Sequence, residues 1–274
     1  MTPGTLLART KEWLKTHKIR VTKRLGQHFL IDATILTQII EYANLSSNEC
    51  ILEIGTGNGA LTHILANKVQ HVYTIEKDKG LYQILLSELE SDKRITLIHG
   101  DAVKINWPKT NKLVANLPYN ISSPVLFKFF ESNIPMAVIM LQKEFAERLT
   151  AEPNSKQYGR LTVMAAYHAN IELLQYIAPE SFYPPPAVDS ALVRIHRKIT
   201  PPFLVKDRNL FAQLTTAFFN QRRKKIRTPL KSVLGHNQFQ QFQDKIPWLD
   251  QRVEELSPEQ IAEIANIITE DISQ

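Results

Sequence analysis

The sequence lacks the features that mark several classes of protein. Its single cysteine, Cys50, excludes an internal disulfide framework and a thiolate metal site, so no metal is expected. No apolar run approaches the length of a transmembrane helix, and the N-terminus has no continuous apolar stretch typical of a secretory signal. We therefore expect a cytoplasmic protein without a membrane partner, in which Cys50 is a reduced, buried core residue.

The composition is that of a globular protein with a basic surface. The 274 residues are 43% hydrophobic and 22% charged, which is sufficient for a full core. Lys and Arg number 33 against 27 Asp and Glu, and the resulting charge of +6 suits a polyanionic partner without proving one. Residues 1–22 are rich in cations. They are either a helical RNA-contacting arm or an organellar transit peptide, and Glu12 and the scarcity of serine favour the arm.

From Cys50 onward, short β-branched runs alternate with helical patterns. The predicted strands are residues 51–54, 72–75, 95–98, 113–115 and 137–141, and the predicted helices are 60–67, 81–89 and 124–131. Such alternation is typical of βαβ units and predicts an α/β fold with a doubly wound, Rossmann-like parallel sheet.

The pattern changes near residue 200. Lys198-Ile199-Thr200-Pro201-Pro202 is a cluster of helix and strand breakers, and every periodic segment beyond it is helical. We predict a sheet domain over residues 23–200 and a small all-α domain over residues 201–274.

A glycine-rich loop follows the first strand. Gly55-Thr56-Gly57-Asn58-Gly59 leads into a helix, so glycines stand where a backbone turns tightly against a ligand. The spacing differs from the dinucleotide fingerprint, and no Gly-Lys-Ser/Thr follows to cradle phosphates. On its own the loop is compatible with a plain turn.

Acidic residues at the next two strand ends strengthen the prediction of a ligand. Glu76 lies about twenty residues beyond the loop, where a carboxylate can accept both hydroxyls of a ribose. Asp101 follows the next strand and suits the amine of an adenine ring. Each could singly be a solvated loop residue, but their succession indicates an adenosine-containing ligand.

The fourth strand ends in Asn116-Leu117-Pro118-Tyr119, continued by Asn120-Ile121-Ser122-Ser123-Pro124. This segment resembles the Asn/Asp-Pro-Pro-Tyr-type loop of adenine amino-methyltransferases, and its Asn-Leu-Pro-Tyr-Asn form is similar to that of the ribosomal RNA adenine dimethyltransferases. The resemblance implies a class I methyltransferase sheet and S-adenosyl-L-methionine as cofactor. A Pro-containing turn with an incidental aromatic residue is the alternative.

Adenine chemistry explains these residue types. The amine is a poor nucleophile because its lone pair is delocalised into the ring. Acceptors on Asn116 and on the backbone of Leu117 or Pro118 can hold its hydrogens, align it with the sulfonium methyl group and favour a pyramidal nitrogen. Pro118 stiffens the loop, and Tyr119 can stack on the base.

Two further segments match the same family. Arg24-Leu25-Gly26-Gln27-His28-Phe29-Leu30 resembles its N-terminal signature, which implies that His28 and Leu30 line the methionine end of the cofactor. Residues 182–190 resemble its late Phe-x-Pro-x-Pro-x-Val-x-Ser segment, which implies that Phe182 closes the other face of the target adenine. Without the resemblance, His28 would be a surface or capping residue and Phe182 a core aromatic.

The resemblance covers roughly residues 20–230, with two departures. Thr56 replaces the usual proline between the first two glycines, and Thr228-Pro229 replaces the customary asparagine after the basic run. Neither change removes a ligand-binding group, so both bear on loop geometry and not on activity.

Cations are concentrated early in the second domain. Arg222, Arg223, Lys224 and Lys225 belong to a run that we expect in a helix, either as a solvated face or as a phosphate-contacting surface. In a chain with an adenine pocket, RNA contact is the better interpretation, and base selection is left to the pocket.

The family resemblance implies a specific substrate. The substrate is a pair of adjacent adenosines near the 3′ end of small-subunit ribosomal RNA, and both become dimethylated. The RNA is either free or part of an immature small subunit, and the enzyme is expected to act as a monomer. The alternatives are a large-subunit methyltransferase of the resistance type, a non-catalytic ribosome-assembly or RNA-binding factor, and a small-molecule methyltransferase, which the basic run disfavours.

Overall fold

The computed structural model describes residues 5–19, 21 and 26–272. The chain divides into two compact units, Met1–Ala146 with Ile171–Arg197, and Glu147–Asn170 with Lys198–Gln274. The division after Arg197 lies close to the boundary expected at residue 200. Residues 147–170, expected in the sheet domain, pack instead with the C-terminal helices.

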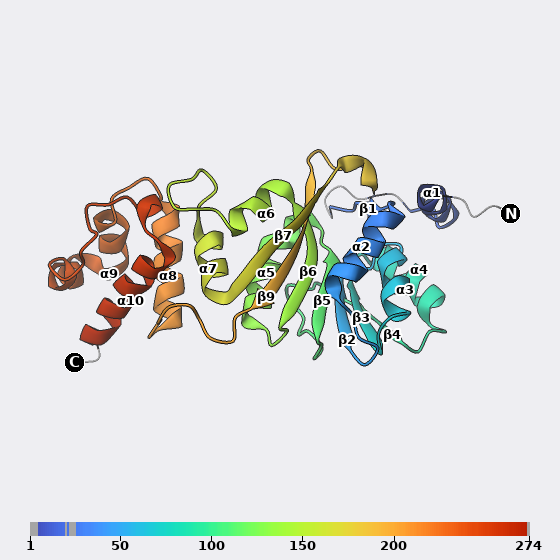
Figure 1. The fold of residues 1–274 in the computed structure, drawn as a ribbon, viewed down its shortest axis with the longest axis horizontal. Helices are drawn as coiled ribbons and strands as arrows, with labels where there is room; N and C mark the ends of the chain where they lie inside the picture. Colours follow the sequence, from blue (N-terminus) through green and yellow to red (C-terminus); the bar gives the residue numbers. More distant parts are fainter. Residues whose placement is uncertain (1–4, 20, 22–25, 273–274) are drawn as a thin grey trace. The chain divides into compact units, whose positions relative to one another are not determined.

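The first unit is built on a seven-stranded sheet with the strand order β4-β3-β2-β5-β6-β9-β7 (Figure 1). All five predicted strands are confirmed and are parallel to one another. They are β2 (Cys50–Ile54), β3 (His71–Glu76), β4 (Ile95–His99), β5 (Lys112–Asn116) and β6 (Met136–Gln142). Their apolar runs fill the centre of the sheet, as expected for strands covered on both faces.

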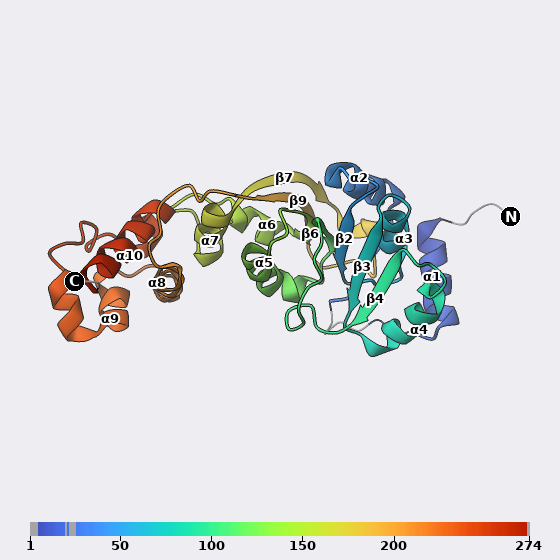
Figure 2. The ribbon, with the colours of Figure 1, turned by 90° about the horizontal axis from the view of Figure 1, so that it is seen from below.

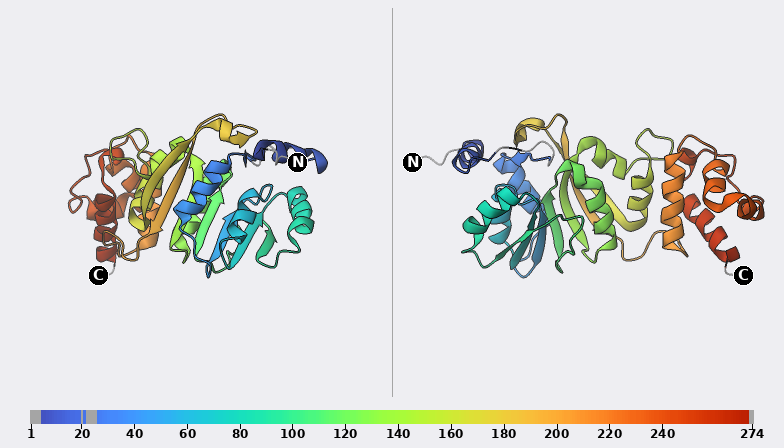
Figure 3. Two further views of the ribbon diagram at one scale, coloured as in Figure 1. Left: turned by 45° about the vertical axis from the view of Figure 1, so that its right-hand side comes forward. Right: turned by 180° about the vertical axis from the view of Figure 1, so that it is seen from behind.

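Two strands of this sheet were not predicted. β7 (Ala169–Ile177) and β9 (Ser190–Arg197) complete the sheet beyond β6, and β9 pairs antiparallel with β6, so the sheet is mixed and not purely parallel. Both appear as the yellow strands of Figure 3. A separate two-residue pairing joins β1 (Phe29–Leu30) to β8 (Phe182–Tyr183). Pairings of two residues leave no periodicity in a sequence.

The helices between the strands are α2 (Ala33–Ala43), α3 (Ala60–Ala66), α4 (Lys79–Leu89) and α5 (Ser122–Glu131). Side chains of Asp32 and Asp78 cap the first turns of α2 and α4 by accepting backbone N–H groups. α2 and α3 lie on one side of the sheet and α5 on the other (Figure 2). The loops that follow the parallel strands therefore gather at one edge, the usual position of a ligand site in such sheets.

Residues from the expected basic arm form helix α1 (Leu6–Thr16). Trp13 packs against the apolar side of α4 and donates its indole N–H to Glu88 at 2.8 Å. The Arg9, Lys11 and Lys15 side chains are exposed, whereas Arg20, Lys23 and Arg24 lie outside the described residues. The segment is thus anchored to the sheet unit by its apolar face.

The second unit is helical, as expected from the sequence beyond residue 200. It contains α7 (Arg160–His168), α8 (Arg208–Asn220), α9 (Arg227–Phe242) and α10 (Pro258–Ile272), and its first residues are the end of α6 (Lys143–Leu149). Tyr167, Phe203 and Phe211 form an aromatic cluster within it. No helix among the described residues is long and apolar enough to span a bilayer.

The prediction that Cys50 is a buried core residue is wrong, because the residue is only partly buried. The free thiol residue is half-buried at the first position of β2, where its backbone N–H donates to the side chain of Asn111. The apolar run that suggested burial begins one residue later.

Candidate functional site

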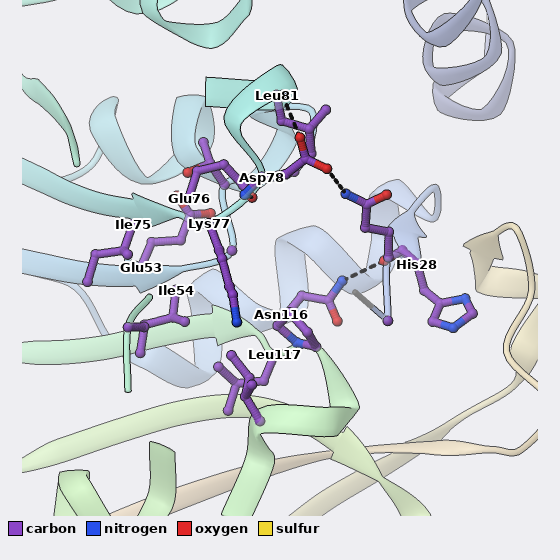
Figure 4. Close-up of a pocket in the computed structure, with 18 of the residues that line it drawn as sticks. His28, Glu53, Ile54, Ile75, Glu76, Lys77, Asp78, Leu81, Asn116 and Leu117 are labelled. Carbon is purple, nitrogen blue, oxygen red and sulfur yellow. Dashed lines mark hydrogen bonds between the residues drawn. The ribbon is translucent and has the colours of Figure 1, made fainter. Parts of the chain in front are cut away.

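A cavity opens where the loops after β2, β3, β4 and β5 meet the segment that precedes α2 (Figure 4). Most of the predicted site residues line it: His28, Leu30, Gly55, Gly57, Glu76, Asp101, Asn116, Leu117, Pro118 and Tyr119. Residues from five separate parts of the sequence thus share one cavity.

The glycine loop forms one wall of this cavity. Gly55 has φ +85° and Gly57 has φ +62°, backbone conformations that residues with a Cβ atom rarely adopt. A Cβ atom on Gly55 would also stand 3.4 Å from Cδ of Pro118, so the glycine lets the loops after β2 and β5 approach closely. Thr56 points into the protein, where its hydroxyl hydrogen-bonds that of Thr74 at 2.7 Å. The departure from proline is thereby accommodated by a buried partner.

Glu76 projects from the end of β3 and is only 6% exposed. One carboxylate oxygen accepts the backbone N–H of Gly57 at 3.2 Å and the other accepts that of Asp78 at 2.8 Å. Burial raises the pKa of Glu76, and these two N–H groups partly oppose that effect. The remaining lone pairs can accept the hydroxyls of a ribose.

Asp101 follows β4 and keeps its negative charge. Lys77 donates to it at 2.9 Å, and this hydrogen-bonded ion pair holds the pKa of Asp101 below its ordinary value. The backbone N–H of Val103 adds a second contact at 3.0 Å. Asp101 is therefore an ionised acceptor at the edge of the cavity.

Asn116 lies at the end of β5, and the backbone of His28 orients its amide. The NH₂ group donates to the carbonyl oxygen of His28 at 3.1 Å (Figure 4). Within the described part of the chain, the side-chain carbonyl of Asn116 has no hydrogen-bond partner. An acceptor is thus held in a fixed direction and remains available to a ligand.

Tyr119 and His28 form an aromatic pair beside Asn116. Their rings are 5.7 Å apart and inclined by 26°, and the Tyr119 hydroxyl is 2.5 Å from that of Ser190. Nδ1 of His28 lies 2.7 Å from the carbonyl oxygen of Pro184. Because that oxygen can only accept, Nδ1 carries the proton. His28 is therefore a partner of both later motifs and not an isolated surface histidine.

Phe182 does not have the position implied by the family resemblance. It is 2% exposed, belongs to the core cluster beneath α2 and does not line the cavity. Its backbone pairs with Leu30 through β1 and β8, which turns its side chain into the core. In this structure Phe182 is a core aromatic residue, and a role toward the target adenine stays a prediction.

The basic run does not lie in a helix. α8 ends at Asn220 and α9 begins at Arg227, so residues 222–225 form the turn between them. The N–H groups of the Ile226 and Val253 backbones connect this turn to the segment before α10. A turn rich in cations replaces the expected helical face.

The four predicted RNA-binding side chains also differ in their surroundings. Arg222 is half-buried, pairs with Glu254 at 2.9 Å and donates to the backbone carbonyls of Ser155 and Lys156. Lys225 is exposed and pairs with Asp250 at 3.1 Å. Arg223 and Lys224 are exposed, and neither forms an ion pair with a described residue. Arg222 therefore has a structural role, holding two backbone carbonyls, that the pattern of charges in the sequence does not indicate.

Several cavity residues were missed in the sequence. Glu53 is 1% exposed in β2 and lies in the wall of the cavity. A charged residue inside an otherwise apolar strand was the signal that could have revealed it. Asn58 of the glycine loop donates to the buried hydroxyl of Thr10 at 3.1 Å, a contact between helix α1 and the cavity wall that the sequence pattern could not reveal.

Comparisons with known proteins identify the family of the chain. The family profile described as ribosomal RNA adenine dimethylase covers residues 18–270. The chain belongs to the ribosomal RNA adenine dimethylase family. A curated relative from Methanococcoides burtonii, named probable ribosomal RNA small subunit methyltransferase A, is 40% identical over 247 residues, covering 88% of this chain and 91% of the relative.

Two solved structures share the fold. A dimethyladenosine transferase from Plasmodium falciparum matches with a TM-score of 0.77 at 27% identity, over 89% of this chain and 98% of that chain. The 23S rRNA methyltransferase ErmE matches with a TM-score of 0.63 at 25% identity, over 88% of this chain and 99% of that chain. Family membership identifies the enzyme as an S-adenosylmethionine-dependent rRNA adenine dimethyltransferase.

The residues of the cavity fit this cofactor. The glycine loop admits a close ligand, Glu76 supplies a carboxylate for ribose hydroxyls, and the wall carries acidic groups suited to a positively charged molecule. A phosphate-bearing cofactor would meet carboxylates in the same places. The donor set therefore favours a cationic nucleoside over a nucleotide.

Replacing Glu76 by alanine should weaken S-adenosylmethionine binding by about 1.5–3 kcal/mol, the usual contribution of hydrogen bonds to a charged group. Isothermal titration calorimetry measures the effect. The exposed Glu90→Ala variant is the matched control and should bind as wild type. An unchanged dissociation constant for Glu76→Ala would remove this carboxylate from the cofactor site.

Arg222→Ala should lower the free energy of unfolding by about 1.5–3 kcal/mol, because its charged hydrogen bonds to Glu254 and to two carbonyls are lost. The exposed Arg223→Ala substitution should change stability by less than about 0.5 kcal/mol. Urea unfolding of both variants tests this difference. Equal stabilities of the two variants would show that Arg222 contributes no more to the free energy of unfolding than Arg223 does.

Proposed function

We propose that this chain transfers methyl groups from S-adenosyl-L-methionine to the exocyclic 6-amino groups of two adjacent adenosines near the 3′ end of small-subunit ribosomal RNA. The products are dimethyladenosines, and the reaction belongs to small-subunit biogenesis. The observation that carries the proposal is the position of Asn116 in the same cavity as Glu76 and Asp101. The small-subunit assignment is supported by the name of the archaeal relative, whose identity exceeds that of the large-subunit enzyme.

The protein's first task is to hold the cofactor. We assign the ribose hydroxyls to Glu76, the adenine amine to Asp101, and the methionine end to the segment containing His28 and Leu30. When bound, the cofactor supplies an electrophilic methyl group on a positively charged sulfur. The glycine loop permits the close backbone approach that such a ligand requires.

The second task is to orient the target amine. The oriented carbonyl of Asn116 accepts one N–H of the amine, and a backbone carbonyl accepts the other. The Pro118 carbonyl already accepts the N–H of Ile121 at 3.1 Å, which favours Leu117 as the backbone acceptor. Both acceptors stabilise the nitrogen as its lone pair leaves the ring, so no strong base is needed for the methyl transfer itself.

Tyr119 places the base. Its hydroxyl is bound to Ser190, which fixes the direction of the ring. A base stacked on an aromatic side chain gains about 1–3 kcal/mol without sequence specificity. Selection of adenine then rests on the acceptors of the loop and not on the ring.

Asn116→Ala should slow methyl transfer at saturating cofactor and RNA by roughly 100- to 1000-fold, the effect of losing one preorganised contact to a reacting group. The variant should fold normally because the side chain faces a cavity. Single-turnover kinetics with small subunits lacking the modification measures the rate. A near-normal rate would rule out the catalytic assignment.

Tyr119→Ala should differ in kind from Asn116→Ala. Stacking acts before as well as during the reaction, so this variant should raise the RNA concentration needed for half-maximal rate more than it lowers the rate at saturation. Titrating RNA in the same assay separates the two effects. A loss confined to the saturated rate would instead give Tyr119 a role in the chemical step.

The exposed cations Arg223 and Lys224 are assigned to RNA phosphates. Replacing both by alanine should flatten the dependence of RNA binding on salt by about 0.7–0.9 log units for each lost contact. Cofactor affinity should not change. If the salt slope equals that of wild type, the turn is a solvated surface and RNA binds elsewhere.

A further inference from the structure

Glu53 is a buried carboxyl without a cationic partner. It lies in β2, two residues before the glycine loop, is 1% exposed and stands in the wall of the cavity. Its hydrogen-bond partner is a hydroxyl: Thr62 of α3 donates to it at 2.6 Å, and Thr74 is its neighbour in register on β3. Within the described chain, no Lys, Arg or His forms an ion pair with Glu53.

Hydroxyl groups connect Glu53 to the glycine loop. Thr74, the register neighbour of Glu53 on β3, hydrogen-bonds Thr56 of the loop at 2.7 Å, so buried hydroxyl groups extend from the loop to the side of the carboxyl group. All of these residues are buried. The glycine loop is therefore anchored by a buried hydroxyl pair next to Glu53.

The charges around Glu53 are mostly negative. On β3, Glu76 raises the pKa of Glu53 further, and Asp78 follows that strand. The cation nearest in sequence to these carboxylates, Lys77, is paired with Asp101. Other titratable groups on packed elements include His28 before β1, His63 on α3, Tyr73 on β3, and His71 and Lys112 at the opposite ends of β3 and β5, where Lys112 pairs with Glu49.

These surroundings favour the neutral acid in the ligand-free protein. Burial is the largest cause and raises the pKa of Glu53 to about 8, against partial opposition from the two threonine hydroxyls. A positive charge entering the cavity has the reverse effect, because it stabilises the ionised form. The expected ligand carries such charge on its sulfonium and ammonium groups.

We propose that Glu53 is the proton-releasing counter-charge of the cofactor pocket, neutral when the pocket contains no cation and ionised when S-adenosylmethionine is bound. The carboxyl O–H bond breaks on binding and the proton passes to the solvent. This inference rests on the proposed cofactor site. It adds a residue that selects a positively charged ligand and couples its binding to pH.

The number of protons released on binding tests the proposal. Titration calorimetry of S-adenosylmethionine in buffers of different ionisation enthalpy should give close to one proton per cofactor near neutral pH for wild type. Affinity should rise by up to tenfold per pH unit below about 8 and level off above it. Methylthioadenosine keeps the nucleoside and the sulfur but is uncharged, so its binding should release no proton.

The Glu53→Gln variant keeps a hydrogen-bond acceptor for Thr62 but cannot ionise. Its binding of S-adenosylmethionine should lose the proton release, whereas the exposed Glu90→Gln control should retain it. Equal proton release by wild type and Glu53→Gln, or release of a proton on binding methylthioadenosine, would overturn the proposal. Binding by wild type without proton release would refute only the role of Glu53, whereas a wild type that does not bind S-adenosylmethionine at all would refute the proposed cofactor site itself.

The ligand-free protein gives an independent measurement. The unfolded chain ionises Glu53 near 4.5 and the folded chain near 8, so rising pH favours the unfolded state between these values. Wild type should therefore lose thermal stability relative to Glu53→Gln as pH rises through this interval. A difference independent of pH would contradict a neutral Glu53.

If Glu53→Gln does not fold, infrared difference spectroscopy of wild type replaces it. The carbonyl stretch of a protonated carboxyl group should disappear when S-adenosylmethionine binds. Its persistence in the complex would overturn the proposal.

Discussion

The cavity depends on the contacts of one residue, His28. Its backbone carbonyl orients the amide of Asn116, its ring stacks beside Tyr119, and its Nδ1–H is bound by the carbonyl of Pro184. Three segments that lie far apart in the sequence are thus fixed against one another. The sheet provides the strand ends, but these contacts convert an edge of the sheet into a cavity with a directed acceptor.

Acidic groups dominate this cavity, and each is stabilised in a different way. Glu76 accepts backbone N–H groups, Asp101 pairs with a lysine, and Glu53 has hydroxyl partners alone. The acidic residues of this cavity therefore differ in how readily they bind a proton. This difference allows one carboxylate to bind sugar hydroxyls while another carboxyl group responds to the charge of the ligand.

The sequence was sufficient to predict the parallel strands and the loops at their ends, because buried strands leave apolar runs and ligand loops leave glycines and carboxylates. It could not predict the surroundings of single side chains. Phe182 and Arg222 matched functional patterns, yet one is a core residue and the other binds backbone carbonyls. Glu53 was overlooked for the converse reason: its role depends on burial and on partners supplied by α3 and β3.

The short pairing of β1 with β8 has a consequence for synthesis of the protein. Phe29 and Leu30 are made early, but their partners Tyr183 and Phe182 emerge only after most of the sheet domain has been translated. The parallel strands can assemble before that point, since domains fold as their segments become available. The wall of the cavity that contains Phe29 and Leu30 cannot be completed before that point. A nascent chain that has already built its central sheet must still wait for Phe182 and Tyr183 before it can hold a methyl donor.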